Sequence, residues 1–142
     1  MKKIVFLDRD GTINYKNDLV SDPTKFKIFP CAAEAIRKIN QSGYLAIVVT
    51  NQPVIARGKC LFDMLDMIHA KMETLLGREG AYLDDIYFCP HHPDKGFPEE
   101  NRRYKVDCDC RKPKPGMFYK AAERYNIDLS QSWMIGDTEI DR

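Results

Sequence analysis

The stretch IVFLDRDGT, residues 4–12, joins an apolar segment to a short acidic turn. Its first four residues form an uninterrupted apolar run, which is typical of a parallel β-strand buried on both faces. Asp8 and Asp10 follow, and Gly11 then indicates a turn. Ligands of an open α/β sheet bind beyond the carboxyl ends of its strands, so the two carboxylates lie where a site is expected. Two carboxylates at such a place can share a hard cation.

Apolar runs of strand length alternate along the chain with segments of helical periodicity. Strands are predicted at residues 3–7, 45–50, 85–89 and 132–136. Helices are predicted at residues 32–41, 61–76 and 117–125. Strands that alternate with helices favour a parallel sheet whose crossover connections cover its faces. We therefore expect an α/β fold, a three-layer Rossmann-like parallel sheet with helices on both faces.

The longest helical segment carries an apolar stripe that we interpret as core. The stripe consists of Leu61, Leu65, Ile68, Met72 and Leu75. An apolar face at helical spacing packs against the rest of a globular protein far more often than it binds a partner. His69 lies in the same segment, and we expect it to have no functional role.

Length and composition are those of one ordinary globular domain. The chain has 142 residues, of which 44% are hydrophobic and 30% charged, so we expect a single domain over residues 1–142. The net charge of +1 does not support a nucleic-acid partner. No apolar run approaches the roughly 20 residues of a membrane span, and the run after Lys3 is too short for a signal peptide. We expect a cytoplasmic monomer that binds neither nucleic acid nor a membrane.

Polar motifs also follow other predicted strands or precede a predicted helix. These motifs are Thr50-Asn51-Gln52, Arg111-Lys112-Pro113 and Gly136-Asp137, with Asp141 after the last of them. Together with Asp8 and Asp10, the ordered set resembles the haloacid dehalogenase superfamily of phosphohydrolases over essentially the whole chain. The ARG motif at residues 56–58 and the cysteine-containing segments at 89–93 and 108–117 resemble a small-cap group within it. That group contains the histidinol-phosphate and the D-glycero-D-manno-heptose 1,7-bisphosphate phosphatases, and the heptose enzymes are the nearer match.

The resemblance implies a covalent mechanism with two aspartates and a metal ion. Asp8 would attack phosphorus and become an aspartyl phosphate, and Asp10 would act as general acid and then as general base. Mg²⁺ would be held by the side chains of Asp8 and Asp137 and by the main-chain carbonyl of Asp10. Asp141 would support the metal site.

The resemblance also implies donors for the phosphate and the substrate. A hydroxyl, a compact cation and a bidentate guanidinium can stabilise charge on phosphate oxygens. The residues that offer them are Thr50, Lys112 and Arg111, while Asn51 and Gln52 would line the substrate site. Related enzymes have a small pair such as Ser-Gly where this chain has Pro53-Val54, so the preferred substrate stays open.

A second group of residues has the spacing of a zinc site. Its members are Cys89, His91, Cys108 and Cys110, with 16 residues between the two pairs. Three thiols and one imidazole suit tetrahedral Zn²⁺, and four protein ligands leave no open position, so the site would be structural. His92 is the rival of His91, which the C-P-H pattern of the related enzymes favours. We expect this zinc-bound loop, about residues 89–110, to stand in place of a large cap.

The sequence stops at Arg142, directly after Asp141. Related enzymes continue with a helix and one more strand. We therefore expect the last strand of the sheet to be absent, which would leave its neighbour as an edge.

The motifs together predict a Mg²⁺-dependent phosphomonoesterase that acts through an aspartyl phosphate on a small phosphorylated metabolite. The resemblance favours heptose 1,7-bisphosphate as the substrate. Histidinol phosphate is the alternative within the same reaction class, although that group tends to have a shorter segment between the zinc pairs. A weakly active or non-catalytic shortened domain is a further alternative, and so is a zinc-ribbon nucleic-acid binder. A non-catalytic module or a nucleic-acid binder would need neither Asp8 nor Asp10, whereas a phosphatase needs both.

Overall fold

Each strand and helix expected from the sequence is present, with ends that differ by no more than two residues. The structure is a computed structural model that describes residues 2–15, 26–51, 62–89, 112, 116–126 and 129–136. The strands are β1 (Ile4–Leu7), β2 (Leu45–Asn51), β3 (Asp85–Cys89) and β4 (Trp133–Ile135). The helices are α1 (Ala32–Gln41), α2 (Phe62–Arg78) and α3 (Gly116–Tyr125), and a short 3₁₀ turn, η3 (Leu129–Gln131), precedes β4.

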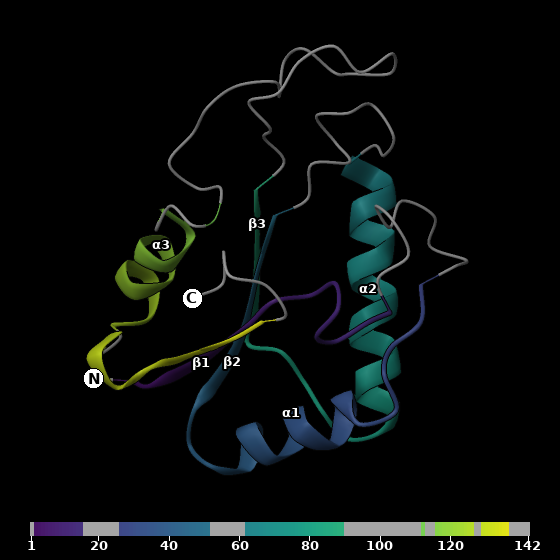
Figure 1. The fold of residues 1–142 in the computed structure, drawn as a ribbon, viewed down its shortest axis with the longest axis horizontal. Coiled ribbons are helices and arrows are strands. Elements are labelled where there is room, and N and C mark those ends of the chain that lie inside the picture. Colours follow the sequence, from purple (N-terminus) through teal and green to yellow (C-terminus); the bar gives the residue numbers. More distant parts are fainter. Residues whose placement is uncertain are drawn as a thin grey trace.

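The strands form one parallel sheet in the order β3-β2-β1-β4. β1 lies in the middle and pairs its Leu7 with Val48 of β2 on one side and with Ile135 of β4 on the other. Because all pairs are parallel, the carboxyl ends of the strands point to the same edge of the sheet (Figure 1). Asp8, directly after β1, and Thr50, near the end of β2, therefore lie at this edge.

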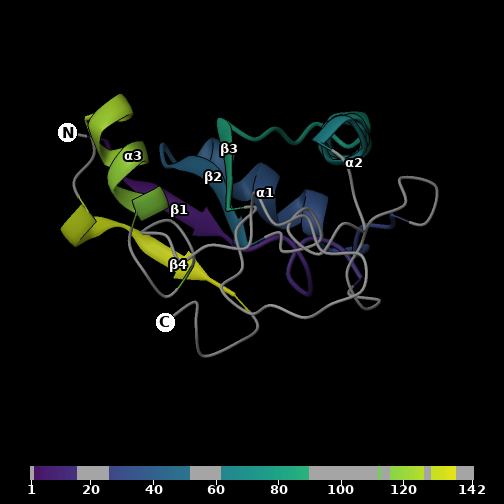
Figure 2. The ribbon, with the colours of Figure 1, turned by 90° about the horizontal axis from the view of Figure 1, so that it is seen from above.

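Helices cover both faces of the sheet, which confirms the expected layering. Successive side chains along a strand point to opposite faces. One face packs on α1 and α2 and the other on α3, as the view from above in Figure 2 shows. The first core includes Leu7, Ala46, Val48, Ile36, Ile68 and Met72, and the second includes Phe6, Ile47, Val49, Met117 and Ala121.

The apolar stripe of α2 is core, as predicted. Of the predicted stripe, Leu65, Ile68 and Met72 are fully buried, Leu75 is partly buried, and Leu61 lies outside the described residues. Leu76, which the predicted stripe does not include, is fully buried as well. Burial of these side chains fixes how α2 is rotated about its axis, and therefore which of its polar residues face the sheet. Among the described residues, no helix is both long and apolar enough to cross a bilayer.

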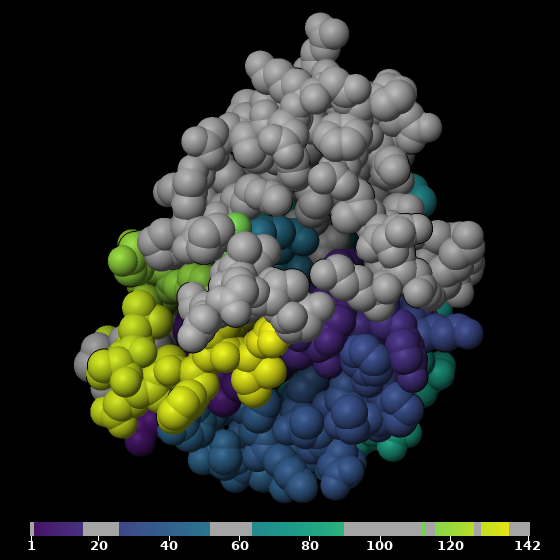
Figure 3. All heavy atoms as spheres, in the orientation of Figure 1, coloured from purple at the N-terminus to yellow at the C-terminus, as the bar shows by residue number. Residues whose placement is uncertain are grey.

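β4 forms an edge of the described sheet and carries exposed apolar side chains. Its Trp133 and Ile135 are 67% and 47% exposed, and Figure 3 shows this strand, in yellow, on the molecular surface. The prediction that a last strand is absent concerns the chain beyond β4 and stays untested.

Candidate active site

A tight loop after β1 holds both aspartates at the carboxyl edge of the sheet. The main-chain N–H of Asp8 donates to the carbonyl of Ile135 at 2.9 Å, so Asp8 is tied to the end of β4. The carbonyl of Arg9 accepts three main-chain N–H groups, those of residues 12–14, at 2.8 to 3.3 Å. Gly11 has a φ of 82°, in the left-handed region that glycine enters without steric cost. The DRDGT motif therefore folds back on itself directly beyond the sheet.

Lys112 forms an ion pair with Asp8 although the two residues are 104 positions apart in the sequence. Its Nζ lies 3.1 Å from Oδ1 of Asp8, and the exposed fractions of the two side chains are 2% and 13%. The attraction is stronger here than between charges at an open surface, because little water screens it. An ammonium at this distance also offsets the repulsion between an anionic carboxylate and an anionic phosphate, which a nucleophilic aspartate requires.

Asn51 holds the main chain of Lys112 with both ends of its carboxamide. Its Nδ2 donates to the carbonyl of Lys112 at 3.1 Å, and its Oδ1 accepts the N–H of Lys112 at 2.9 Å. The preceding Thr50 is buried, and its hydroxyl donates to the carbonyl of Asn51 at 3.4 Å. We expected Asn51 to line the substrate site. Its described contacts position Lys112, and a contact with substrate stays a prediction.

Asn51→Ala should therefore lower activity far more than its effect on stability explains. Loss of two hydrogen bonds should cost about 2 kcal/mol of unfolding free energy, and displacement of Lys112 by about 1 Å should cost about 10²-fold in kcat/KM. The matched control is Asn40→Ala. Asn40 holds the main chain of Tyr82 in the same way, with its Nδ2 donating at 2.9 Å and its Oδ1 accepting at 3.1 Å. Denaturation and steady-state kinetics on both variants check the prediction, and equal activity losses would contradict it.

The Asp10 carboxylate is oriented by two side-chain donors that meet at one of its oxygens. Oδ1 of Asp10 accepts from Nε of Arg9 at 2.9 Å and from Nδ2 of Asn14 at 2.9 Å. Asn14 is fully buried, and its Nδ2 also donates to the carbonyl of Tyr15 at 3.1 Å. The carboxylate itself is 17% exposed, so its position is fixed while a substrate can still reach it.

Two buried side chains that we did not predict to belong to the site lie behind Asp10. Arg9 is fully buried, its Nη1 donates to Nε2 of His69 at 3.1 Å, and its guanidinium lies 5.8 Å from the centre of the Phe26 ring. We expected no functional role for His69, yet its contact with Arg9 ties α2 to the DRDGT loop. The sequence held a signal for this contact. His69 stands four residues after Leu65, on the buried side of α2, where a polar side chain needs a partner.

Acid should destabilise the fold through His69. Burial, and then the positive charge of Arg9, lower the pKa of His69 from 6.5 to about 3. Between these pH values the unfolded chain takes up a proton that the folded chain does not. Acidification from pH 6.5 towards pH 3 should therefore lower the free energy of unfolding by roughly 1.4 kcal/mol per pH unit through His69.

His69→Gln isolates this contribution, because glutamine does not titrate. Chemical denaturation at pH 7 and pH 5 should show a stability loss in the wild type that exceeds the loss in the variant by roughly 2 kcal/mol. Equal losses in the two proteins would show that His69 keeps an ordinary pKa in the folded chain.

Several predicted site residues lie outside the described part of the chain. They are Gln52, Arg111, Asp137, Asp141, His91, Cys108 and Cys110. Of the four predicted zinc ligands the structure describes Cys89, which is buried at the end of β3. The zinc loop, the cap and the third carboxylate of the metal site therefore stay predictions.

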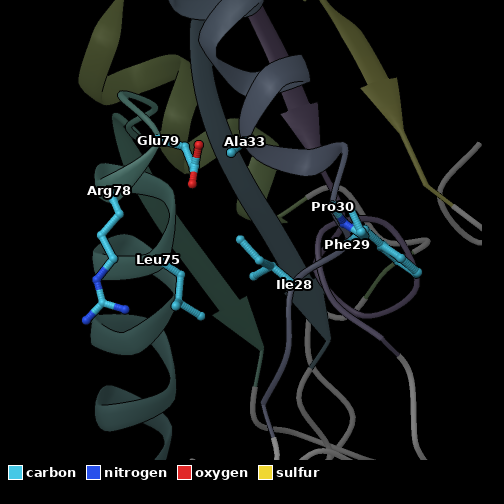
Figure 4. A pocket seen from close by; sticks show the side chains of 7 residues that line it. All are labelled: Ile28, Phe29, Pro30, Ala33, Leu75, Arg78 and Glu79. Carbon is cyan, nitrogen blue, oxygen red and sulfur yellow. The ribbon is translucent and has the colours of Figure 1, made fainter.

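A separate hollow lies between the segment before α1 and the last turns of α2. It has a volume of about 470 Å³. In Figure 4 the side chains of Ile28 and Leu75 approach each other within it, while that of Arg78 points away. Its lining contains none of the predicted site residues, so it gives no support to the catalytic interpretation.

Comparisons with known proteins point to one family. The model of the haloacid dehalogenase-like hydrolases matches residues 7–142. The D-glycero-β-D-manno-heptose-1,7-bisphosphate 7-phosphatase of Pasteurella multocida is 43% identical over 137 residues, which cover 96% of this chain and 72% of that protein.

Two solved structures are similar to this chain in fold and in sequence. The D,D-heptose 1,7-bisphosphate phosphatase of B. bronchiseptica, complexed with magnesium and phosphate, aligns with a TM-score of 0.84 and 36% identity. The alignment covers 98% of this chain and 72% of that one. A haloacid dehalogenase-like protein of Mesorhizobium loti aligns with a TM-score of 0.91 and 35% identity, over 99% of this chain and 65% of that one. The likeness extends over nearly the whole chain, and the family match spans residues 7–142, a range that contains the DRDGT motif, so this chain belongs to the haloacid dehalogenase-like hydrolases.

Proposed function

We propose that this chain is a Mg²⁺-dependent phosphatase that removes the 7-phosphate of D-glycero-β-D-manno-heptose 1,7-bisphosphate. The observation that carries the proposal is the buried ammonium of Lys112, 3.1 Å from the Asp8 carboxylate at the carboxyl edge of the sheet. The names and identities of the relatives from P. multocida and B. bronchiseptica support the substrate. The alignment with this chain covers 72% of the length of each of these two relatives.

The chemistry follows from the placement of the two aspartates. A carboxylate oxygen of Asp8 attacks phosphorus while the bond from phosphorus to the sugar oxygen breaks, and the leaving oxygen takes a proton from Asp10. A water molecule then gives a proton to Asp10 and attacks the phosphorus of the aspartyl phosphate. Inorganic phosphate leaves, and the Asp8 carboxylate is restored. Lys112 stabilises negative charge on the phosphate oxygens in both steps.

The donor set at the strand ends fits Mg²⁺. Hard cations prefer oxygen ligands, and the loop presents the carboxylate of Asp8 and the main chain of Asp10 within two residues of each other. Asp137, outside the described residues, would complete the protein ligands. Bound Mg²⁺ would neutralise phosphate charge and so favour attack by an anionic carboxylate. The related structure from B. bronchiseptica, complexed with magnesium and phosphate, supports this assignment.

A second metal should copurify with the protein. We propose structural Zn²⁺ held by Cys89, His91, Cys108 and Cys110 in a loop that replaces a large cap. Metal analysis should find about one zinc per chain, and Cys108→Ser should lose both the zinc and much of the thermal stability, because metal binding is coupled to folding. Cys31→Ser is the matched control, since Cys31 is exposed and lies outside the predicted ligand set. Protein made with zinc available that contained none would contradict the proposal.

A panel of phosphate monoesters tests the proposed substrate. It includes heptose 1,7-bisphosphate, histidinol phosphate and glucose 6-phosphate. Each ester is assayed with Mg²⁺ and the wild-type protein, and the rate measured with Asp8→Asn serves as the blank. The value of kcat/KM should be highest for the heptose bisphosphate by about tenfold or more, as expected when a site hydrogen-bonds its own substrate. Preference for histidinol phosphate would contradict the substrate, and no hydrolysis of any ester would contradict the phosphatase assignment.

A further inference from the structure

A chain of hydrogen bonds connects the carboxylate of Asp10, through Arg9, to His69 on α2. Nε of Arg9 and Nδ2 of Asn14 both donate to Oδ1 of Asp10, and Nη1 of Arg9 donates to Nε2 of His69 on α2, 60 residues away in the sequence. We infer that Arg9, anchored by His69, is a positioning residue that determines which oxygen of Asp10 carries the catalytic proton. The inference rests on the proposed function, in which Asp10 is the general acid.

Arg9 is suited to this task because its guanidinium is planar and rigid. Two of its nitrogens are engaged at once, Nε at 2.9 Å from Asp10 and Nη1 at 3.1 Å from His69. Contacts at two points of a planar group fix the direction in which the group faces. The side chain is fully buried, and the Phe26 ring lies 5.8 Å away. A charge so far from water is retained only with partners that hold it in place.

His69 is suited to be the anchor because its helix is fixed and its ring is neutral. Its neighbours Leu65, Ile68 and Met72 are fully buried, so α2 cannot shift without disturbing the core. Arginine can only donate, so Nε2 of His69 must accept and the ring proton must lie on Nδ1. The lowered pKa of His69, about 3, agrees with a ring that stays neutral beside a guanidinium.

The consequence concerns the Asp10 carboxyl group in its protonated form. An oxygen that accepts two hydrogen bonds, one of them from a cation, is a poor place for a proton. A proton on Oδ1 would disrupt its hydrogen bonds from Arg9 and Asn14, so the proton of Asp10 is directed to Oδ2. Without the anchor, Arg9 can turn, the carboxyl group can rotate with it, and proton transfer to the leaving oxygen becomes less effective.

The test compares two substrates that need this proton to different extents. A sugar phosphate releases a poor leaving group that must be protonated, whereas p-nitrophenyl phosphate releases a good one. We use kcat/KM, which reports steps up to the first phosphoryl transfer and excludes the later hydrolysis that both substrates share. His69→Leu, which removes the acceptor at similar volume, should lower kcat/KM for the sugar phosphate by about 10- to 100-fold, the range known for residues that orient the ligands of a catalytic metal. The p-nitrophenyl ester should lose about twofold at most.

Two further variants separate positioning from stability. His69→Gln keeps an acceptor for Arg9 and should restore most of the activity on the sugar phosphate. Leu76→Ala, a fully buried core change on the same helix, should lower stability without changing the ratio of the two kcat/KM values. A wild-type ratio in His69→Leu, or the same change of ratio in Leu76→Ala, would overturn the inference.

The position of the His69 ring proton can be measured on the wild-type protein, so this test does not depend on whether a variant folds. In ¹⁵N NMR of the wild-type protein, the His69 ring should carry its proton on Nδ1, and a proton on Nε2 would overturn the inference. Asp10→Asn separates a failure of the proposed mechanism from a failure of the inference about Arg9 and His69. If it does not selectively impair the sugar phosphate, Asp10 is not the general acid, and the proposed mechanism fails together with the inference. If it does and His69→Leu does not, the inference alone fails.

Discussion

Replacement of Asp8 by asparagine should reduce turnover to background while the fold is kept. An amide has nearly the shape of a carboxylate, but its oxygen is a far weaker nucleophile, so the first displacement on phosphorus should not occur. The loss should be roughly 10⁴- to 10⁶-fold, the range seen when an enzyme loses a nucleophile or the base that activates it. The amide oxygen can still accept from Nζ of Lys112, which lies 3.1 Å from Oδ1 in the wild type, but the buried ammonium loses its anionic partner. The thermal midpoint should therefore fall, while the chain stays folded at the assay temperature.

The matched control for this variant is Asp84→Asn. Asp84 accepts the N–H of Ala46 at 2.8 Å, at the amino-terminal ends of β2 and β3 and therefore away from the site. The same chemical change there should leave kcat/KM within about twofold of the wild type, as expected far from the reacting groups. Steady-state assays and thermal unfolding compare the two variants. Turnover by Asp8→Asn close to that of the wild type would contradict the covalent mechanism.

Asp10→Asn should give the second largest effect, and one that depends on the leaving group. The main-chain carbonyl of residue 10 is unchanged, so the Mg²⁺ requirement should persist. The value of kcat/KM for a sugar phosphate should fall by roughly 10²- to 10⁴-fold, the usual contribution of general acid–base catalysis. The fall should be much smaller for p-nitrophenyl phosphate, whose leaving group needs little protonation. Equal losses on both esters would assign Asp10 another role.

In the described part of the chain, the ends of the helices and strands could be predicted to within two residues, because their signals are local. The apolar runs of β1 and β2 and the periodic stripe of α2 follow from the neighbours of each residue, and the alternation of strands with helices sets the parallel sheet. The positions of Asp8 and Thr50 at the same edge follow from that topology alone. The meeting of Asp8 with Lys112 is not a local property. It was implied by the resemblance to a family.

The supporting contacts of the site could not be predicted, because each joins distant parts of the sequence. The carboxamide of Asn51 meets the main chain of Lys112 across 61 residues, and His69 meets Arg9 across 60. An asparagine after a strand suggests a substrate contact as readily as a structural one. The spacing of His69 from Leu65 indicates that His69 lies on the buried side of α2. Its partner could not be inferred, because that depends on where the DRDGT loop folds back in space.

³¹P NMR of D-glycero-β-D-manno-heptose 1,7-bisphosphate, recorded during incubation with the protein and Mg²⁺, shows which phosphate the enzyme removes. The two phosphates of the substrate give separate signals, and inorganic phosphate gives a third. We expect the 7-phosphate signal to disappear as inorganic phosphate appears, the 1-phosphate signal to persist, and Asp8→Asn to leave the spectrum unchanged. A stable spectrum with the wild-type protein, or loss of the 1-phosphate first, would contradict the proposed function.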